Sequence, residues 1–420
     1  MTNSFTVLPP PDQLGNSLSR FESTGAESVP LPARPRYLSL DMWRGLACLM
    51  IVVWHASLYM TVTVPDETKH HIDLATSILV HLIALLQAGV PMFFVISGYC
   101  IAATADSTRR KSRPIGEFFA RRFRRIFPPF WIFIELTALV VGVTAALGYS
   151  SLFSDAHHPI HLPWALSVFQ WLGNVTLTET WRFHLFGEGK QFLSGQAWTL
   201  CYEEQFYAVC GLVLMLSARR FFTGMVVVTV LTLALQVLAA KWHWDMKGFF
   251  FDGHWFQFAA GVLVYYQRNY VTKGRSRVLL ALLGCAAVVS ICRTDLAKIA
   301  TGLSAALVFA CLLGLLQRWD EQISRALILR PLSWCGAMCY SLYLVHWPVV
   351  KAVSHLMWLG GIRGVWPTLC LTIPVAAAIA IAASWAFHCL VERHFLNPMR
   401  DENPIVLANA KTREPGTLAA

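Results

Sequence analysis

The sequence predicts an all-α polytopic membrane protein with about ten transmembrane helices and both termini in the cytoplasm. Two features of the composition indicate a membrane protein: 56% of the 420 residues are hydrophobic and only 14% are charged, and the mean hydropathy is +0.51. Soluble globular domains carry about 25% charged residues. A third feature is the gathering of the apolar residues into long runs, separated by short polar segments.

Ten apolar runs are long enough to be spans, because a helix needs roughly 20 residues to cross the bilayer. The predicted spans are about 44–64, 86–104, 126–147, 197–217, 221–240, 250–267, 277–293, 297–317, 334–354 and 366–388. The run 72–85 is interpreted as an interfacial helix that leads into the second span. The mixed stretch 148–196 is interpreted as a long loop that dips back toward the bilayer.

The two ends of the chain differ from this middle part. Residues 1–36 are polar, rich in Pro, Ser and Gly, and lack the charged start and apolar core of a cleavable signal. We therefore predict a disordered cytoplasmic tail at 1–36, a transmembrane domain at 37–396 and a second disordered cytoplasmic tail at 397–420.

The basic residues indicate the orientation. With the N-terminus inside, 25 of the 34 lysines and arginines fall in the inner segments, as the positive-inside rule requires. Orientation in the membrane therefore explains the net charge of +10, and nucleic-acid binding is not expected.

Arg44 and His55 bracket the first part of the first span. Eleven helical positions make three turns and about 20° more, with a rise of about 16 Å, so both side chains are predicted on one face. Arg44 would lie at the cytoplasmic surface, where a simple interfacial anchor is the alternative to a functional role. His55 would lie near mid-membrane, where an ionisable residue suggests a functional site and a hydrogen-bonded core histidine is the alternative.

The second span and the basic segment after it carry further candidates. Ser97 and Gly98 lie mid-span, where small residues allow close helix packing. Arg122 and Arg125 follow at the membrane surface, just before Pro128. Such a basic cluster is commonly an anchor or a contact with anionic lipid, but guanidinium groups also suit a phosphorylated cytoplasmic ligand.

Glu203 and Glu204 are predicted at the outer end of the fourth span. Adjacent helical positions diverge by about 100°, so at most one carboxylate is expected to face the core. Glu203 is the candidate for a buried base, a hydroxyl binder or a partner of a histidine, whereas Glu204 is expected to be solvated. A second mid-membrane histidine, His346, follows Tyr343 by one turn on the same side.

Two charged pairs near helix ends have simpler interpretations. Glu392 and Arg393 are expected to reach the cytoplasmic surface and pair with each other. Asp252 and His254 lie near the outer start of the sixth predicted span, where they suit helix capping or contact with a glycan.

Several motifs now stand in a recognisable order. They are YLSLDMWRGLA with Arg44, ten residues and His55; FFVISGY; Arg122-x-x-Arg125 with Pro128; WTLCYEEQFY; and YLVHWP. The ordered set, over about residues 36–396, resembles the membrane acyltransferase-3 family of bacterial integral-membrane O-acyltransferases. The sequence departs from the family at Cys339, where a serine is common, and at His394, where a proline is usual.

The resemblance implies an enzyme of the bacterial cytoplasmic membrane. Such an enzyme moves an acyl group, usually acetyl, from a cytoplasmic acyl-CoA to a hydroxyl of an extracytoplasmic or membrane-associated glycan. Acetyl-CoA or another acyl-CoA is then a substrate, and no permanently bound cofactor and no metal site are expected. The expected partners are the acyl-CoA, the hydroxyl acceptor and the lipid bilayer.

The residues take roles within this interpretation. His55 is expected to be the general base, with Arg44 and Glu203 completing the catalytic group. Arg44, Arg122 and Arg125 are expected to bind the donor phosphates. Ser97, Tyr343 and His346 are expected to line the path or stabilise an oxyanion. The alternative function is a proton-coupled transporter of a small polar solute, because intramembrane His and Glu residues also mark proton relays.

Overall fold

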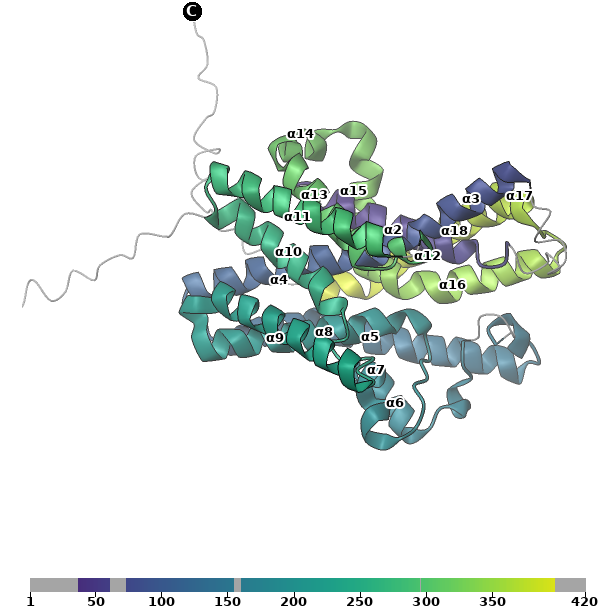
Figure 1. Ribbon diagram of the computed structural model, residues 1–420. Helices are drawn as coiled ribbons and strands as arrows, with labels where there is room; N and C mark the ends of the chain where they lie inside the picture. Colours follow the sequence, from purple (N-terminus) through teal and green to yellow (C-terminus); the bar gives the residue numbers. More distant parts are fainter. Residues whose placement is uncertain (1–36, 61–72, 155–159, 295, 397–420) are drawn as a thin grey trace, which may run out of the picture. The chain divides into compact units, whose positions relative to one another are not determined.

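The computed structural model describes residues 37–60, 73–154, 160–294 and 296–396, and the predicted tails 1–36 and 397–420 lie outside these ranges. Within them the chain is helical and contains no strand, which confirms the predicted all-α class (Figure 1). The α-helices are α2 (Leu40–Ala56), α3 (Leu74–Leu85), α4 (Gly89–Arg110), α5 (Ile115–Ala146), α6 (Val168–Val175), α7 (Glu179–Phe186), α8 (Trp198–Ser217), α9 (Phe221–Trp242), α10 (His254–Tyr270), α11 (Lys273–Arg293), α12 (Leu296–Ile299), α13 (Leu303–Leu316), α14 (Asp320–Arg325), α15 (Arg330–Ala337), α16 (Cys339–Leu359), α17 (Val365–Pro367) and α18 (Ile373–Leu390).

Each of the ten predicted spans overlaps one of these helices. In the described part of the chain, six helical stretches are long and apolar enough to cross a membrane: Leu74–Arg110, Ile115–Ala146, Gly195–Trp242, Lys273–Arg293, Leu303–Arg325 and Val365–His394. These stretches indicate a multi-pass membrane protein. The count of ten spans and the cytoplasmic position of both termini stay predictions.

Helix α2 contacts α4, α15, α16 and α18. The two residues just before it are held by a carboxylate from a distant part of the chain, because Asp320 accepts hydrogen bonds from the backbone N–H groups of Leu38 (2.8 Å) and Ser39 (2.9 Å). The helix ends at Ala56, so it is shorter than the predicted span 44–64.

Helices α4 and α10 touch through two glycines. A Cβ at Gly98 would lie 2.0 Å from the carbonyl oxygen of Phe258, and one at Gly261 would lie 1.9 Å from that of Val95. Only residues without a Cβ fit at both positions, as the expected packing through small residues requires. Because Gly98 must face α10, this contact fixes the rotation of α4 about its axis and therefore the direction of the neighbouring Ser97.

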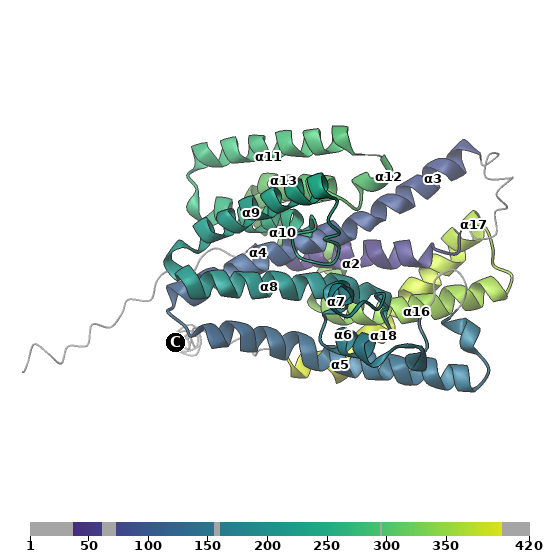
Figure 2. The ribbon, with the colours of Figure 1, turned by 60° about the horizontal axis from the view of Figure 1, so that its bottom comes forward.

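The described part of the predicted loop 148–196 contains two short helices, α6 and α7, which the sequence did not predict. A buried ion pair holds α7, because Arg182 Nε lies 2.6 Å from Glu179 Oε2. Glu179 also accepts a hydrogen bond from the backbone N–H of Gln191 (2.7 Å), which draws the following chain against α7. Figure 2 shows that α8 consequently begins alongside the middle of the long helix α5.

Candidate active site

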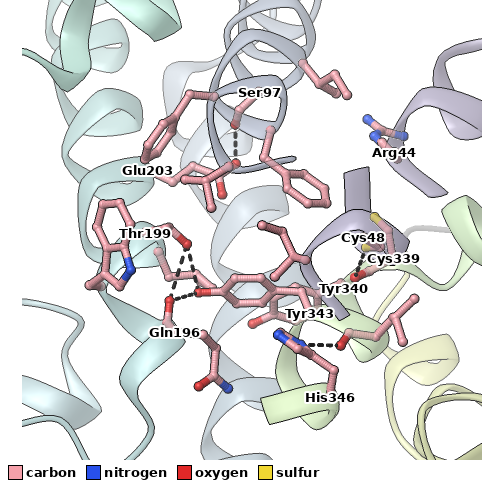
Figure 3. A pocket seen from close by; sticks show the side chains of 18 of the residues that line it. Arg44, Cys48, Ser97, Gln196, Thr199, Glu203, Cys339, Tyr340, Tyr343 and His346 are labelled. Carbon is pink, nitrogen blue, oxygen red and sulfur yellow. Dashed lines mark hydrogen bonds between the residues drawn. The ribbon is translucent and has the colours of Figure 1, made fainter. Parts of the chain in front are cut away.

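A cavity of about 420 Å³ lies among α2, α4, α5, α8 and α16. Its lining includes all eight residues that the sequence singled out as site residues: Arg44, His55, Ser97, Arg122, Arg125, Glu203, Tyr343 and His346. Figure 3 labels Arg44, Ser97, Glu203, Tyr343 and His346 around the same space, with Arg44 and Glu203 toward one side and His346 toward the other. The prediction that Arg44 and His55 share one face of α2 is therefore confirmed, because both reach this cavity.

At one side of the cavity His55 is bonded to the second histidine. His55 Nδ1 lies 3.1 Å from His346 Nε2, and His346 Nδ1 lies 2.8 Å from the carbonyl oxygen of Leu342. Two indoles flank His55, with ring centroids 4.6 Å away for Trp54 and 4.7 Å away for Trp347. Glu203 was expected as a possible histidine partner, but the structure gives His55 a different one, namely His346.

A side-chain hydrogen bond that compensates for a proline joins the helix of His346 to the residues just before α8. Pro348 has no N–H, so the carbonyl of Leu344 lacks its usual helical donor. Gln196 supplies the missing hydrogen bond, with its Nε2 2.8 Å from Leu344 O. Tyr343 strengthens this junction, because its hydroxyl lies 2.5 Å from Gln196 O and 2.9 Å from Thr199 Oγ1.

Arg44 lies at the other end of its three helical turns. Its guanidinium donates to Asp41 Oδ1 (2.7 Å) on the same helix and to the thiol of Cys100 (2.8 Å) on α4. The side chain is 20% exposed, so it reaches both the cavity and the protein surface.

A charged cluster occupies the wall formed by α4, α5 and α8. Arg122 Nη2 lies 3.1 Å from Glu203 Oε1, and Arg122 Nε donates to Glu204 Oε1 (2.9 Å). Ser97 donates a hydrogen bond to Glu203, and the guanidinium of Arg122 stands 3.9 Å from the ring centre of Tyr207.

This cluster corrects two expectations. Arg122 was expected on the donor side and Glu203 at the outer end of its helix, but the two side chains are paired. The physical reason is the place where α8 begins. The helix starts alongside the middle of α5, so its first turns lie next to the part of α5 that carries Arg122. Glu204 was expected to be solvated, but it binds Arg122 because the edges of one guanidinium can serve two diverging carboxylates.

Arg125, one turn after Arg122, differs from it in its partners. It lines the cavity and is partly exposed. Within the described ranges its guanidinium makes no hydrogen bond and no ion pair, so of the two cavity-lining arginines of α5 it is the one available to an anionic ligand.

One further expectation about a charged pair is wrong. Glu392 does not pair with Arg393. It is buried, and it accepts from the Ser341 hydroxyl (2.5 Å) and lies 2.9 Å from His388 Nδ1.

Asp252 accepts only a long hydrogen bond (3.4 Å) from the backbone N–H of His254, the first residue of α10, and that helix has no side-chain bond at its N-cap. Asp252 binds His254 Nδ1 (2.7 Å), the Tyr202 hydroxyl and the Gly248 N–H (2.8 Å).

The family comparison agrees with this assembled site. The model of a family described as "Acyltransferase domain" matches residues 37–388, which include every residue of the cluster. The chain belongs to the membrane acyltransferase-3 family. It is therefore an acyltransferase, as the order of its motifs predicted.

Curated relatives of this acyltransferase come from bacteria. A putative membrane-bound transacylase, BcsY, of Komagataeibacter xylinus is 26% identical over 70% of this chain and 76% of its own. Nodulation protein 10 of Rhizobium leguminosarum bv. viciae is 27% identical over 83% of this chain and 91% of its own. The exopolysaccharide production protein ExoZ of Rhizobium meliloti is 31% identical over 34% of this chain and 36% of its own. No solved structure matches the acyltransferase.

Several residues of the acyltransferase site escaped the sequence reasoning. Cys100, which binds Arg44, and Gln196, which completes the helix at Leu344, carried no motif. Pro348 was the available signal for Gln196, since a proline inside a helix predicts a carbonyl in need of a donor four residues earlier. The described residues contain no group of three His, Cys, Asp or Glu side chains suited to a metal ion.

Proposed function

We propose that this acyltransferase moves an acyl group, acetyl in the first instance, from a cytoplasmic acyl-CoA to a hydroxyl of an extracytoplasmic or membrane-associated glycan. The single observation that carries the proposal is one cavity lined both by Arg125, whose guanidinium is not engaged by the described residues, and by His55. A phosphorylated thioester and a hydroxyl need these two kinds of group, a cation and a base.

The donor would be held by its phosphates at the Arg44 and Arg125 side of the cavity. Arg44 keeps one edge on Asp41, whereas Arg125 offers its whole guanidinium. We assign Arg122 a different role from the expected phosphate contact, because two carboxylates already neutralise it. The rise from Arg44 to His55, about 16 Å, is a distance that an extended pantetheine arm can bridge.

The chemistry would take place at His55. The acceptor hydroxyl loses its proton to the imidazole as its oxygen attacks the thioester carbonyl. The tetrahedral oxyanion then collapses, the carbon–sulfur bond breaks, and the CoA thiolate takes the proton back from the imidazolium. Atoms and charge balance in this sequence, and the products are the ester and free CoA.

Two observations support a glycan as the acceptor: the indoles beside His55 and the names of the relatives. Indoles stack on sugar rings, and Trp54 and Trp347 flank His55 in the cavity wall. The names of two relatives, an exopolysaccharide production protein and a nodulation protein, support an acceptor of the cell envelope or a secreted saccharide. The bacterial cytoplasmic membrane is the corresponding location.

The test uses the purified full-length protein in lipid nanodiscs. Acetyl-CoA is expected to bind, and free CoA is expected to appear when envelope glycans from a strain that lacks the gene are added. Mass spectrometry of those glycans should show one acetyl increment per modified sugar. Uptake of an intact solute by reconstituted vesicles without CoA release would instead support the transporter alternative.

A further inference from the structure

We infer that His346 is a positioning residue that holds His55 in the tautomer whose Nε2 is the basic nitrogen. The inference rests on the proposed acyl transfer at His55. It replaces the expected role of His346 as a path-lining or oxyanion group. It follows from a chain of two hydrogen bonds that runs from the Leu342 carbonyl through His346 to His55.

The first link fixes the proton on His346. A backbone carbonyl oxygen can only accept, so the nitrogen that lies 2.8 Å from Leu342 O must carry hydrogen. That nitrogen is Nδ1 of His346. The bond joins a side chain to its own helix four residues earlier, so the imidazole is held against α16 whether or not substrate is present.

The second link depends on the charge of His346. The side chain is only 2% exposed, and burial of an uncompensated charge is costly. The titratable groups in contact with it are His55 of α2 and Tyr343 of its own helix, and among the described residues no carboxylate bonds to it. A neutral His346 with its proton on Nδ1 has a lone pair on Nε2.

His55 must then be the donor between the two rings. Its Nδ1 lies 3.1 Å from the His346 lone pair, so Nδ1 carries the hydrogen and Nε2 of His55 does not. This is the same logic by which a buried acceptor orients the histidine of a hydrolytic triad, with a neutral imidazole in place of the carboxylate.

The arrangement also serves the reaction step. When His55 Nε2 takes the proton of the acceptor hydroxyl, the resulting imidazolium keeps its Nδ1–H bonded to His346 Nε2, and the positive charge strengthens that bond. His346 therefore stabilises the charged form of His55 without touching the substrate. Loss of the acceptor at position 346 should make His55 a weaker base.

The tautomer can be measured in the wild-type protein without any substrate. Solid-state ¹⁵N NMR of histidine-labelled protein in bilayers, with the His55 signals identified by their loss in His55→Gln, reports which ring nitrogen carries hydrogen. The inference expects the Nδ1–H form of His55 at neutral pH. The Nε2–H form would overturn it, and this result does not depend on whether acyl transfer occurs.

Kinetics provide the second measurement. His346→Phe keeps a ring but removes the acceptor, and kcat for acetyl transfer is expected to fall about 100-fold or more, with the KM for acetyl-CoA within twofold. The acidic limb of the pH–rate profile should move to lower pH. His346→Gln, which restores an acceptor oxygen, should recover part of kcat.

The control is His388→Gln, which removes a histidine that bonds to Glu392 and does not line the cavity. It should leave the pH–rate profile unchanged. A His346→Phe protein with wild-type kcat and profile, or with only a raised KM, would contradict the inference. If wild-type protein forms no ester, the proposed function fails even where the NMR result stands.

Discussion

Arg122 and Arg125 lie one turn apart on α5, yet only Arg122 is bound to carboxylates, those of Glu203 and Glu204. Both arginines line the cavity. Arg122 is thus part of the wall, whereas Arg125 is a cation without a hydrogen-bonded or ion-paired partner in the described ranges of the chain. The two positions should therefore respond differently to substitution.

Arg125→Gln is expected to weaken donor binding without loss of stability. A charge-assisted hydrogen bond contributes about 1.5–3 kcal/mol, so the Kd for CoA in nanodiscs should rise about tenfold or more. The matched control is Arg124→Gln, because Arg124 is exposed and does not line the cavity. Equal affinities of the two variants would remove Arg125 from the donor site.

Glu203→Gln is expected to lower the thermal unfolding temperature more than Glu204→Gln. Glu203 bonds both Ser97 and Arg122, whereas Glu204 bonds Arg122. A buried group that loses its partner costs about 1–3 kcal/mol. The double variant should be less stable than the sum of the single effects, because Arg122 then loses both counter-ions. An additive double variant in thermal melts would show that the two carboxylates act independently.

Gly98→Ala is expected to prevent correct assembly of α4 and α10. The added Cβ would lie 2.0 Å from the Phe258 carbonyl oxygen, which belongs to backbone and cannot swing aside. Gly284→Ala on α11 is the control, because nothing lies within 4 Å of its Cβ and alanine favours a helix by about 1 kcal/mol. The yield of monodisperse protein on size exclusion measures both, and a normal yield for Gly98→Ala would refute the close contact.

Gln196→Ala is expected to destabilise the junction between α8 and α16. The carbonyl of Leu344 would lose its donor, at a cost of about 1–3 kcal/mol. Pro348→Ala supplies a backbone N–H four residues after Leu344, so the same Gln196 substitution should cost less in that background. A double-mutant cycle on thermal unfolding measures the coupling, and a coupling near zero would mean that Gln196 does not replace the helical bond.

The sequence was informative about the elements and about the members of the site. Apolar runs predicted a helix at each of the ten places, because the need for helical structure in lipid depends on local composition. Helical periodicity was enough to place Arg44 and His55 on one face.

Pairings between helices were not predictable in the same way. The bond between His55 and His346 joins residues 291 positions apart, and the pair of Arg122 with Glu203 depends on where α8 begins. Both follow from the packing of helices and from the course of residues 160–196 before α8, for which no local sequence pattern exists. Because this course was not predicted, the count of basic residues placed Arg122 at the cytoplasmic surface and Glu203 at the outer surface of the membrane.

The most direct test of the central claim is acetyl transfer by His55→Gln. Membranes from a strain that lacks the gene, resupplied with wild-type or variant protein, would be given [¹⁴C]acetyl-CoA, and hydroxylamine-labile label in the glycan fraction would be counted. Wild-type protein should form labelled ester, and His55→Gln, with unchanged CoA affinity, should form it at least about 100-fold more slowly, as loss of a general base predicts. Ester formation at the wild-type rate by a folded His55→Gln protein would contradict the account.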